Sequence, residues 1–74
     1  MIQDHVAANV RAELGRADRT QDDLARQLGW TPAFLNRRIK GHVSFSDDEA
    51  REIAEALEVP LSAIVPQLPK RKVS

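Results

Sequence analysis

The segment TQDDLARQLGWTPAFLNRR places two short helical patterns on either side of a very tight corner. The first pattern begins with Thr20, a residue type that caps helices, and ends before Gly29, where a left-handed cap favours glycine. The second begins at Thr31-Pro32, a capping hydroxyl followed by proline at the first helical position. Two short helices joined by a tight turn that contains glycine predict a helix-turn-helix.

The remaining chain predicts three more helices. An apolar residue recurs every four positions between Ile2 and Leu14, which indicates a first helix over about residues 4–17, and Asp18 is its expected end. Ser46, followed three residues later by Glu49, forms a capping box for the fourth helix, which ends before Pro60. Residues 61–65 are long enough for a short fifth helix. We therefore expect an all-α, compact five-helix bundle over residues 1–66 and a basic tail over residues 67–74.

Length and composition restrict the class of protein. A chain of 74 residues forms one domain, and its small core supplies limited stability. Small domains often gain stability by forming dimers. There is no cysteine, which fits a reducing cytoplasm. No apolar run approaches the length of a membrane helix or a signal sequence, so we expect a soluble protein of the bacterial cytoplasm or nucleoid, with no membrane partner.

The formal net charge is zero, but the charges are unevenly distributed. Residues 24–44 contain four basic side chains and no acidic one, and these are Arg26, Arg37, Arg38 and Lys40. Residues 45–60 contain six acidic side chains against one arginine. The positive segment coincides with the tight corner, which favours contact with an anionic partner over an ordinary solvated surface.

A helical wheel separates the side chains of the second corner helix. Leu35 and Ile39 fall on the side expected to be buried. Arg38 shares a flank with Phe34, where it is placed for a phosphate or for solvent. The opposite side is polar and exposed, and it carries Ala33, Asn36, Arg37 and Lys40.

The sequence gives little support for catalysis. His5 and His42 are far apart in sequence and have no nucleophile or metal-ligand spacing near them. The acidic residues Asp47, Asp48 and Glu49 are better explained as the first turn of a helix than as a pair of catalytic carboxylates. No glycine-rich phosphate loop is present. We therefore expect no enzyme activity, no metal, no cofactor and no small-molecule ligand.

With these elements in place, the sequence resembles the Cro/cI-type helix-turn-helix repressors, the XRE family, over about residues 4–65. The resemblance is carried by Thr20-Gln21, Leu24-Ala25, Gly29, Leu35, Gly41, Ile53-Ala54, Ala56-Leu57 and Val59. It implies a lambda-repressor-like DNA-binding domain that binds a double-stranded DNA operator, often as a symmetric dimer.

The resemblance also implies which residues contact DNA. Thr20 and Gln21 would contact phosphate at the start of the second helix. The base-reading positions would be Pro32, Ala33, Asn36 and Arg37. Apart from the resemblance, we also expect Thr31, Arg38 and Lys40 to contact DNA.

Three features depart from the family pattern. Pro32 stands where many relatives carry a polar base-reading side chain, so it offers only apolar contact. Leu14 and Ile39 stand where some relatives pair an arginine with a glutamate, so we expect them to pack together. Phe45 stands where proline is frequent, and we expect burial of its ring to anchor the loop.

The sequence thus predicts a sequence-specific transcriptional regulator, a small phage or bacterial repressor. The expected homodimer is weak without DNA and uses Leu61, Val65 and Leu68. Two alternatives stay open at this point. One is a protein-interaction module, antitoxin-like or an anti-repressor partner, that binds through the fourth helix or the tail. The other is a DNA-binding fragment of a longer chain.

Overall fold

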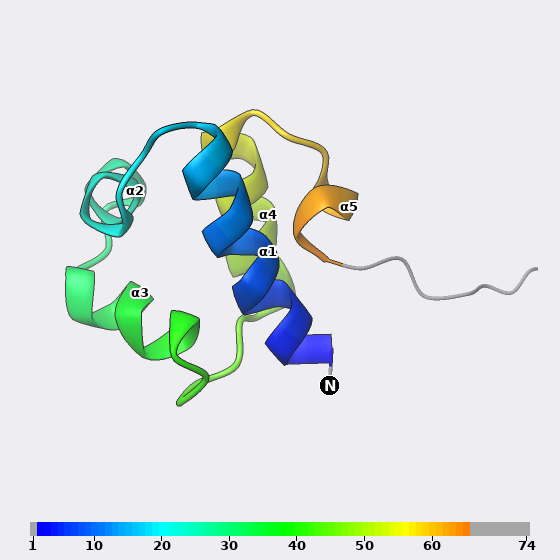
Figure 1. Ribbon diagram of the computed structural model, residues 1–74. Helices are drawn as coiled ribbons and strands as arrows, with labels where there is room; N and C mark the ends of the chain where they lie inside the picture. The colour runs from blue at the N-terminus through cyan, green and yellow to red at the C-terminus, as the bar shows by residue number, and fades with distance from the viewer. Residues whose placement is uncertain (1, 66–74) are drawn as a thin grey trace, which may run out of the picture.

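The computed structural model describes the backbone of residues 2–65 and the side chains of residues 5–65. Within these residues the protein is all-helical, as expected, and contains no strand (Figure 1). The helices are α1 (Ile2–Arg16), α2 (Gln21–Leu28), α3 (Pro32–Ile39), α4 (Asp47–Leu57) and α5 (Leu61–Ile64). The basic tail lies outside the described residues.

Three helices start at the caps that the sequence predicts. The hydroxyl oxygen of Thr20 accepts the Asp23 backbone N–H at 3.0 Å, and that of Thr31 accepts the Phe34 N–H at 3.1 Å. Ser46 forms the full capping box of α4. The sequence predicts that α1 starts near Asp4, but the helix begins two residues earlier, at Ile2. No stop signal interrupts the apolar spacing that begins there.

Four helices end in the same hydrogen-bonded turn, with one residue in the left-handed region. In α2 this residue is Gly29, with a φ of 75°, and after α3 it is Gly41, with a φ of 87°. Asp18 and Glu58 take the same position after α1 and α4, with φ values of 56° and 59°. At Gly29 the Trp30 N–H reaches back to the Ala25 carbonyl at 2.8 Å, which closes the helix and begins the corner.

The helices pack around one core (Figure 1). α1 and α4 lie against each other in the centre, α2 and α3 pack on one side of them, and α5 packs on the other. The core is aliphatic apart from one aromatic ring and consists of Val6, Ala7, Val10, Leu14, Leu24, Ala25, Leu35, Ile39, Phe45, Ala50, Ile53, Ala54, Leu57 and Ile64. Burial of these side chains supplies the main driving force for folding.

The polar contacts of α1 attach the outer elements to this centre. Arg11 Nη1 donates to the Ile39 carbonyl at 3.2 Å, which satisfies a free carbonyl at the end of α3. Asn9 Nδ2 donates to the Ile64 carbonyl at 3.0 Å, at the end of α5. Leu14 and Ile39 are both 5% exposed and share the core, and Phe45 is buried as expected. None of the described helices could cross a membrane.

Candidate nucleic-acid interface

The corner between α2 and α3 is held by a small residue, a glycine and two aromatic rings. Ala25 is completely buried, which allows the two helices to approach closely. Trp30 is half-buried and packs against the core, and its ring centroid lies 5.0 Å from that of Phe34 at a tilt of 55°. A tilted pair at this distance is a favourable aromatic contact. The corner is therefore a rigid element that fixes where α3 points.

The helix α3 is divided into a buried and an exposed side, as the wheel predicts. Leu35 and Ile39 are in the core. Pro32, Ala33, Arg37 and Lys40 are exposed, and Asn36 is half-buried. In the described part of the chain, neither Arg37 nor Lys40 forms an ion pair. Both cations are therefore free to meet a ligand.

At the start of α2 the structure places Thr20 and Gln21 at the surface, exposed and half-buried respectively. The Thr20 oxygen accepts the Asp23 N–H, which leaves its hydroxyl proton available as a donor. The helix N-terminus attracts anions. The exposed carboxylates of Asp22 and Asp23 in the same turn oppose this attraction, although Arg26 pairs with Asp23 at 3.3 Å. Thr31 uses its oxygen in the same way at the start of α3.

The expectation that Arg38 stands on an open flank is wrong. Its side chain is only 14% exposed, and its Nε donates to Glu49 Oε1 at 2.9 Å. Its Nη1 donates to the Phe34 carbonyl at 3.1 Å, and its guanidinium carbon lies 3.7 Å from the centroid of the Phe34 ring. The helical wheel places Arg38 correctly on the same flank as Phe34, but the first turn of α4 covers that flank. Residues of the protein itself therefore bind this arginine.

Glu49 has two partners at one oxygen. Its Oε1 accepts both the Ser46 backbone N–H, at 2.9 Å, and Arg38 Nε. Burial raises the pKa of Glu49, but the hydrogen bonds from Ser46 and Arg38 and the charge of Arg38 outweigh burial and hold that pKa below its ordinary value of 4.5. The carboxylate is thus ionised at neutral pH.

This geometry predicts an acid-sensitive contribution to stability. Because the pKa of Glu49 is lowered on folding, the contribution is present above pH 4.5 and is lost as the pH falls through the folded pKa. The difference in unfolding free energy between wild type and Glu49→Gln should stay constant from about pH 7 to about pH 5 and shrink at lower pH. Urea unfolding at a series of pH values measures it.

The control for this prediction is Arg38→Met, which keeps an unbranched side chain without the charge. In that background the Glu49→Gln difference should change less between neutral and acidic pH, because the guanidinium no longer lowers the pKa of Glu49. A wild-type difference that does not change with pH would contradict the assignment.

A shallow hollow of about 420 Å³ lies beside the exposed side of α3. It is lined by Thr31, Ala33, Phe34, Arg37, Arg38 and Val43. Val43, which is half-buried, comes from the loop after α3 and was not among the residues expected at the site. Its neighbours His42 and Ser44 are exposed, and no spacing in that loop sets Val43 apart. It adds apolar surface beside Arg37.

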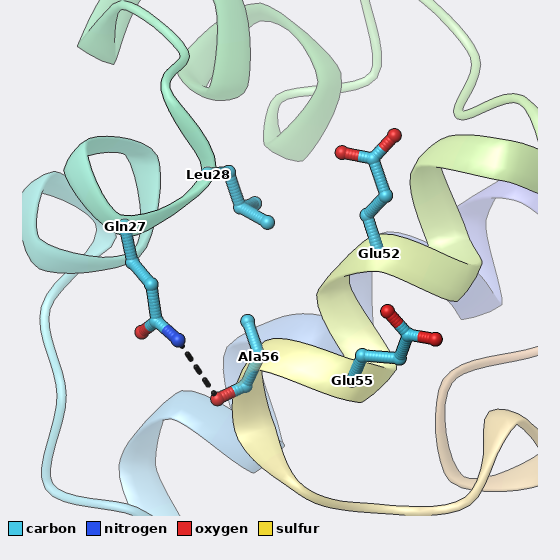
Figure 2. A pocket seen from close by; sticks show the side chains of 5 residues that line it. All are labelled: Gln27, Leu28, Glu52, Glu55 and Ala56. Carbon is cyan, nitrogen blue, oxygen red and sulfur yellow. Dashed lines mark hydrogen bonds between the residues drawn. The ribbon is translucent and has the colours of Figure 1, made fainter.

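A second hollow, of about 380 Å³, lies between α2 and α4 and has an acidic lining. Figure 2 shows Leu28 of α2 pointing toward α4, with the carboxylates of Glu52 and Glu55 on the α4 side. Gln27 bridges the two helices, with its amide nitrogen 3.5 Å from the Ala56 carbonyl oxygen. These carboxylates would repel phosphate, so this face would turn away from a nucleic acid.

The described residues contain no cluster of side chains that could hold a metal ion. His5 and His42 are both exposed, on α1 and in the loop after α3.

In comparison with known proteins, a family model described as helix-turn-helix matches residues 10–64, from the middle of α1 through α5. No curated protein and no solved structure matches the chain at a significant level.

Proposed function

Because the chain belongs to the Cro/cI-type (XRE) helix-turn-helix family of DNA-binding regulators, we propose that it is a sequence-specific repressor that inserts α3 into the major groove of an operator. The observation that supports this most is the division of α3. Its inner side is locked into the core by Leu35 and Ile39, while its outer side presents Arg37 and Lys40 without ion pairs to the described residues.

The exposed residues of α3 divide into reading and positioning roles. Arg37 suits bidentate contact with the O6 and N7 atoms of guanine, and Asn36 suits adenine. Pro32 and Ala33 offer apolar contact to a thymine methyl group. Lys40 is a point charge for the groove or for a phosphate.

Phosphate contacts at the edge of the site would set the register of the protein on DNA. The Thr20 hydroxyl and the Gln21 amide at the start of α2 are proposed for this role, together with Thr31. We do not assign a phosphate contact to Arg38, because Glu49 and Phe34 bind its guanidinium within the fold.

Selection from a pool of random DNA duplexes tests the proposal. The protein should enrich one short motif, and it should bind that motif about 10³-fold or more tightly than a scrambled duplex at physiological salt. Enrichment of no motif, with equal binding to all duplexes, would contradict sequence-specific recognition.

We further propose that the protein binds its full site as a two-fold dimer. One helix of this length reads too few bases alone, and Leu61 on α5 is the one large hydrophobic side chain that is exposed among the described residues, at 38%. Val65 is half-buried against the core, and Leu68 lies outside the described residues. The proposed setting is a phage or bacterial repressor acting in the cytoplasm.

The dimer predicts a stoichiometry. Sedimentation on selected DNA should show two chains per full site, with half-sites about 10 bp apart, centre to centre. Leu61→Asp should weaken pairing on DNA, whereas Ser62→Asp, which adds the same charge at the next exposed position, should have a smaller effect. One chain per full site at saturation would contradict the dimer.

The acidic hollow between α2 and α4 offers a surface for the alternative, a module whose main task is to bind another protein. This alternative would be favoured if the protein binds a basic partner protein in the absence of DNA. That binding should be lost in the double variant Glu52→Gln/Glu55→Gln and kept in Arg37→Ala.

A further inference from the structure

The ion pair between Arg38 and Glu49 joins the last turn of the proposed recognition helix to the first turn of α4. Glu49 is 19% exposed at its side chain, so both charged groups are largely withdrawn from water. Residues 40–46 separate the two helices along the chain. The pair therefore spans this loop and fixes the end of α3 relative to α4.

The pair is one link in a continuous row of contacts. Trp30 in the corner packs on Phe34, the Phe34 ring lies under the Arg38 guanidinium, and Arg38 binds Glu49. Glu49 in turn accepts the backbone N–H of Ser46, whose hydroxyl oxygen caps α4. Because the same carboxylate oxygen serves the cap and the arginine, the cap holds the carboxylate in the orientation that Arg38 needs.

The two neighbouring arginines of α3 are thereby given different environments. Arg37 is exposed and has no described ion-pair partner, while Arg38 has its charge compensated inside the fold. An unrestrained arginine at position 38 would be one more cation at the edge of the DNA-facing surface, where it would attract any phosphate regardless of base sequence.

We infer that Glu49 is a positioning residue for DNA recognition, which fixes α3 through Arg38 and withholds the Arg38 guanidinium from the DNA backbone, so that discrimination between sequences rests on Arg37. This inference depends on the proposed function. It assigns to α4 a role in specificity although α4 itself need not touch DNA.

The first test compares Glu49→Gln with Asp48→Asn. Both variants remove one negative charge from the first turn of α4, but the Asp48 side chain is 87% exposed and pairs with Arg51 on its own helix at 3.0 Å. The probes are the duplex selected by the wild-type protein and a scrambled duplex of the same composition, each titrated at several salt concentrations. Circular dichroism confirms that each variant is folded.

In Glu49→Gln the charge that holds Arg38 against α4 is lost, and only the contacts with Phe34 remain. The guanidinium should then add up to one phosphate contact, so the slope of log affinity against log salt should steepen by up to about 0.9. Binding to the scrambled duplex should rise, and the preference for the selected duplex should fall by about three- to tenfold, a part of what one bidentate base contact contributes. Asp48→Asn should leave the slope and the preference close to the wild-type values. Equal changes in the two variants would overturn the inference.

Glu49→Asp provides a second test that does not alter the net charge. Its side chain is one methylene shorter, so the carboxylate should no longer reach Arg38 Nε, and the salt slope should again steepen. Combining either Glu49 variant with Arg38→Met should return the slope to the wild-type value, because no guanidinium is left to release. A slope that steepens as much without Arg38 as with it would show that Glu49 acts on its own, and would overturn the inference.

The outcomes separate this inference from the proposed function. If the wild-type protein does not prefer its selected duplex, sequence-specific binding itself fails. If the wild type is selective and folded Glu49→Gln and Glu49→Asp keep the same slope and preference, only the role of Glu49 fails.

Discussion

Ile39→Ala is expected to lower the free energy of unfolding by about 2–5 kcal/mol, the range for truncating a buried aliphatic side chain. Ile39 is 5% exposed, shares the core with Leu14, and lies where Arg11 from α1 binds the end of α3. A domain of this size has a total stability of only about 5–15 kcal/mol, so this one change can consume a large part of it. Chemical denaturation of the two proteins measures the loss.

Leu61→Ala is the matched control, because it truncates an aliphatic side chain that is exposed. It should cost clearly less than Ile39→Ala, because Leu61 is 38% exposed and its truncation removes less buried apolar surface from the core. If Ile39→Ala unfolds at the same denaturant concentration as the wild-type protein, Ile39 does not anchor α3 to the core. The outward orientation of Arg37 and Lys40 would then need another cause.

Arg37→Ala is expected to weaken binding to the selected duplex by about 1–3 kcal/mol and to relax base preference at one position per half-site. Arg37 is exposed on the outer side of α3, so the fold should be unaffected. Binding to a scrambled duplex should weaken much less, because on that duplex the variant loses only the attraction of one positive charge and no base contact. Titrations on both duplexes at several salt concentrations distinguish the two effects.

Lys40→Ala is the control for Arg37→Ala, since it removes an exposed cation from the same side of α3. It should weaken binding to all sequences alike and reduce the salt slope by about one if the lysine contacts a phosphate. If the two variants lose affinity equally on both duplexes, α3 contributes charge and does not read sequence.

The helices and the corner could be predicted because their signals are local. Thr20, Thr31 and Ser46 each cap the helix that follows them, and Gly29 and Gly41 take left-handed positions that other residues adopt at a cost. The inward side of α3 also follows from spacing alone. The left-handed conformation of Glu58 could not be predicted from its residue type, which seldom adopts it. There the Val59 N–H donates to the Ala54 carbonyl at 3.0 Å, the bond that closes the turn.

The environment of Arg38 could not be predicted for a different reason. A helical wheel gives the direction of a side chain but not the element that lies in that direction. Glu49 is recognisable from sequence as half of a capping box, but its bond to Arg38 depends on how the loop returns α4 to the end of α3. The roles of the remaining site residues on DNA stay predictions.

Insertion of α3 into the major groove is tested most directly by mapping the DNA contact onto the protein by NMR, with the selected duplex as ligand and each backbone amide followed during the titration. We expect the largest changes on residues 31–40 and at the start of α2, with little change along the acidic side of α4. Methylation of guanine N7 in the major groove should block binding. Changes concentrated on α4 with α3 unaffected, together with undiminished binding to N7-methylated DNA, would contradict insertion of α3 into the major groove.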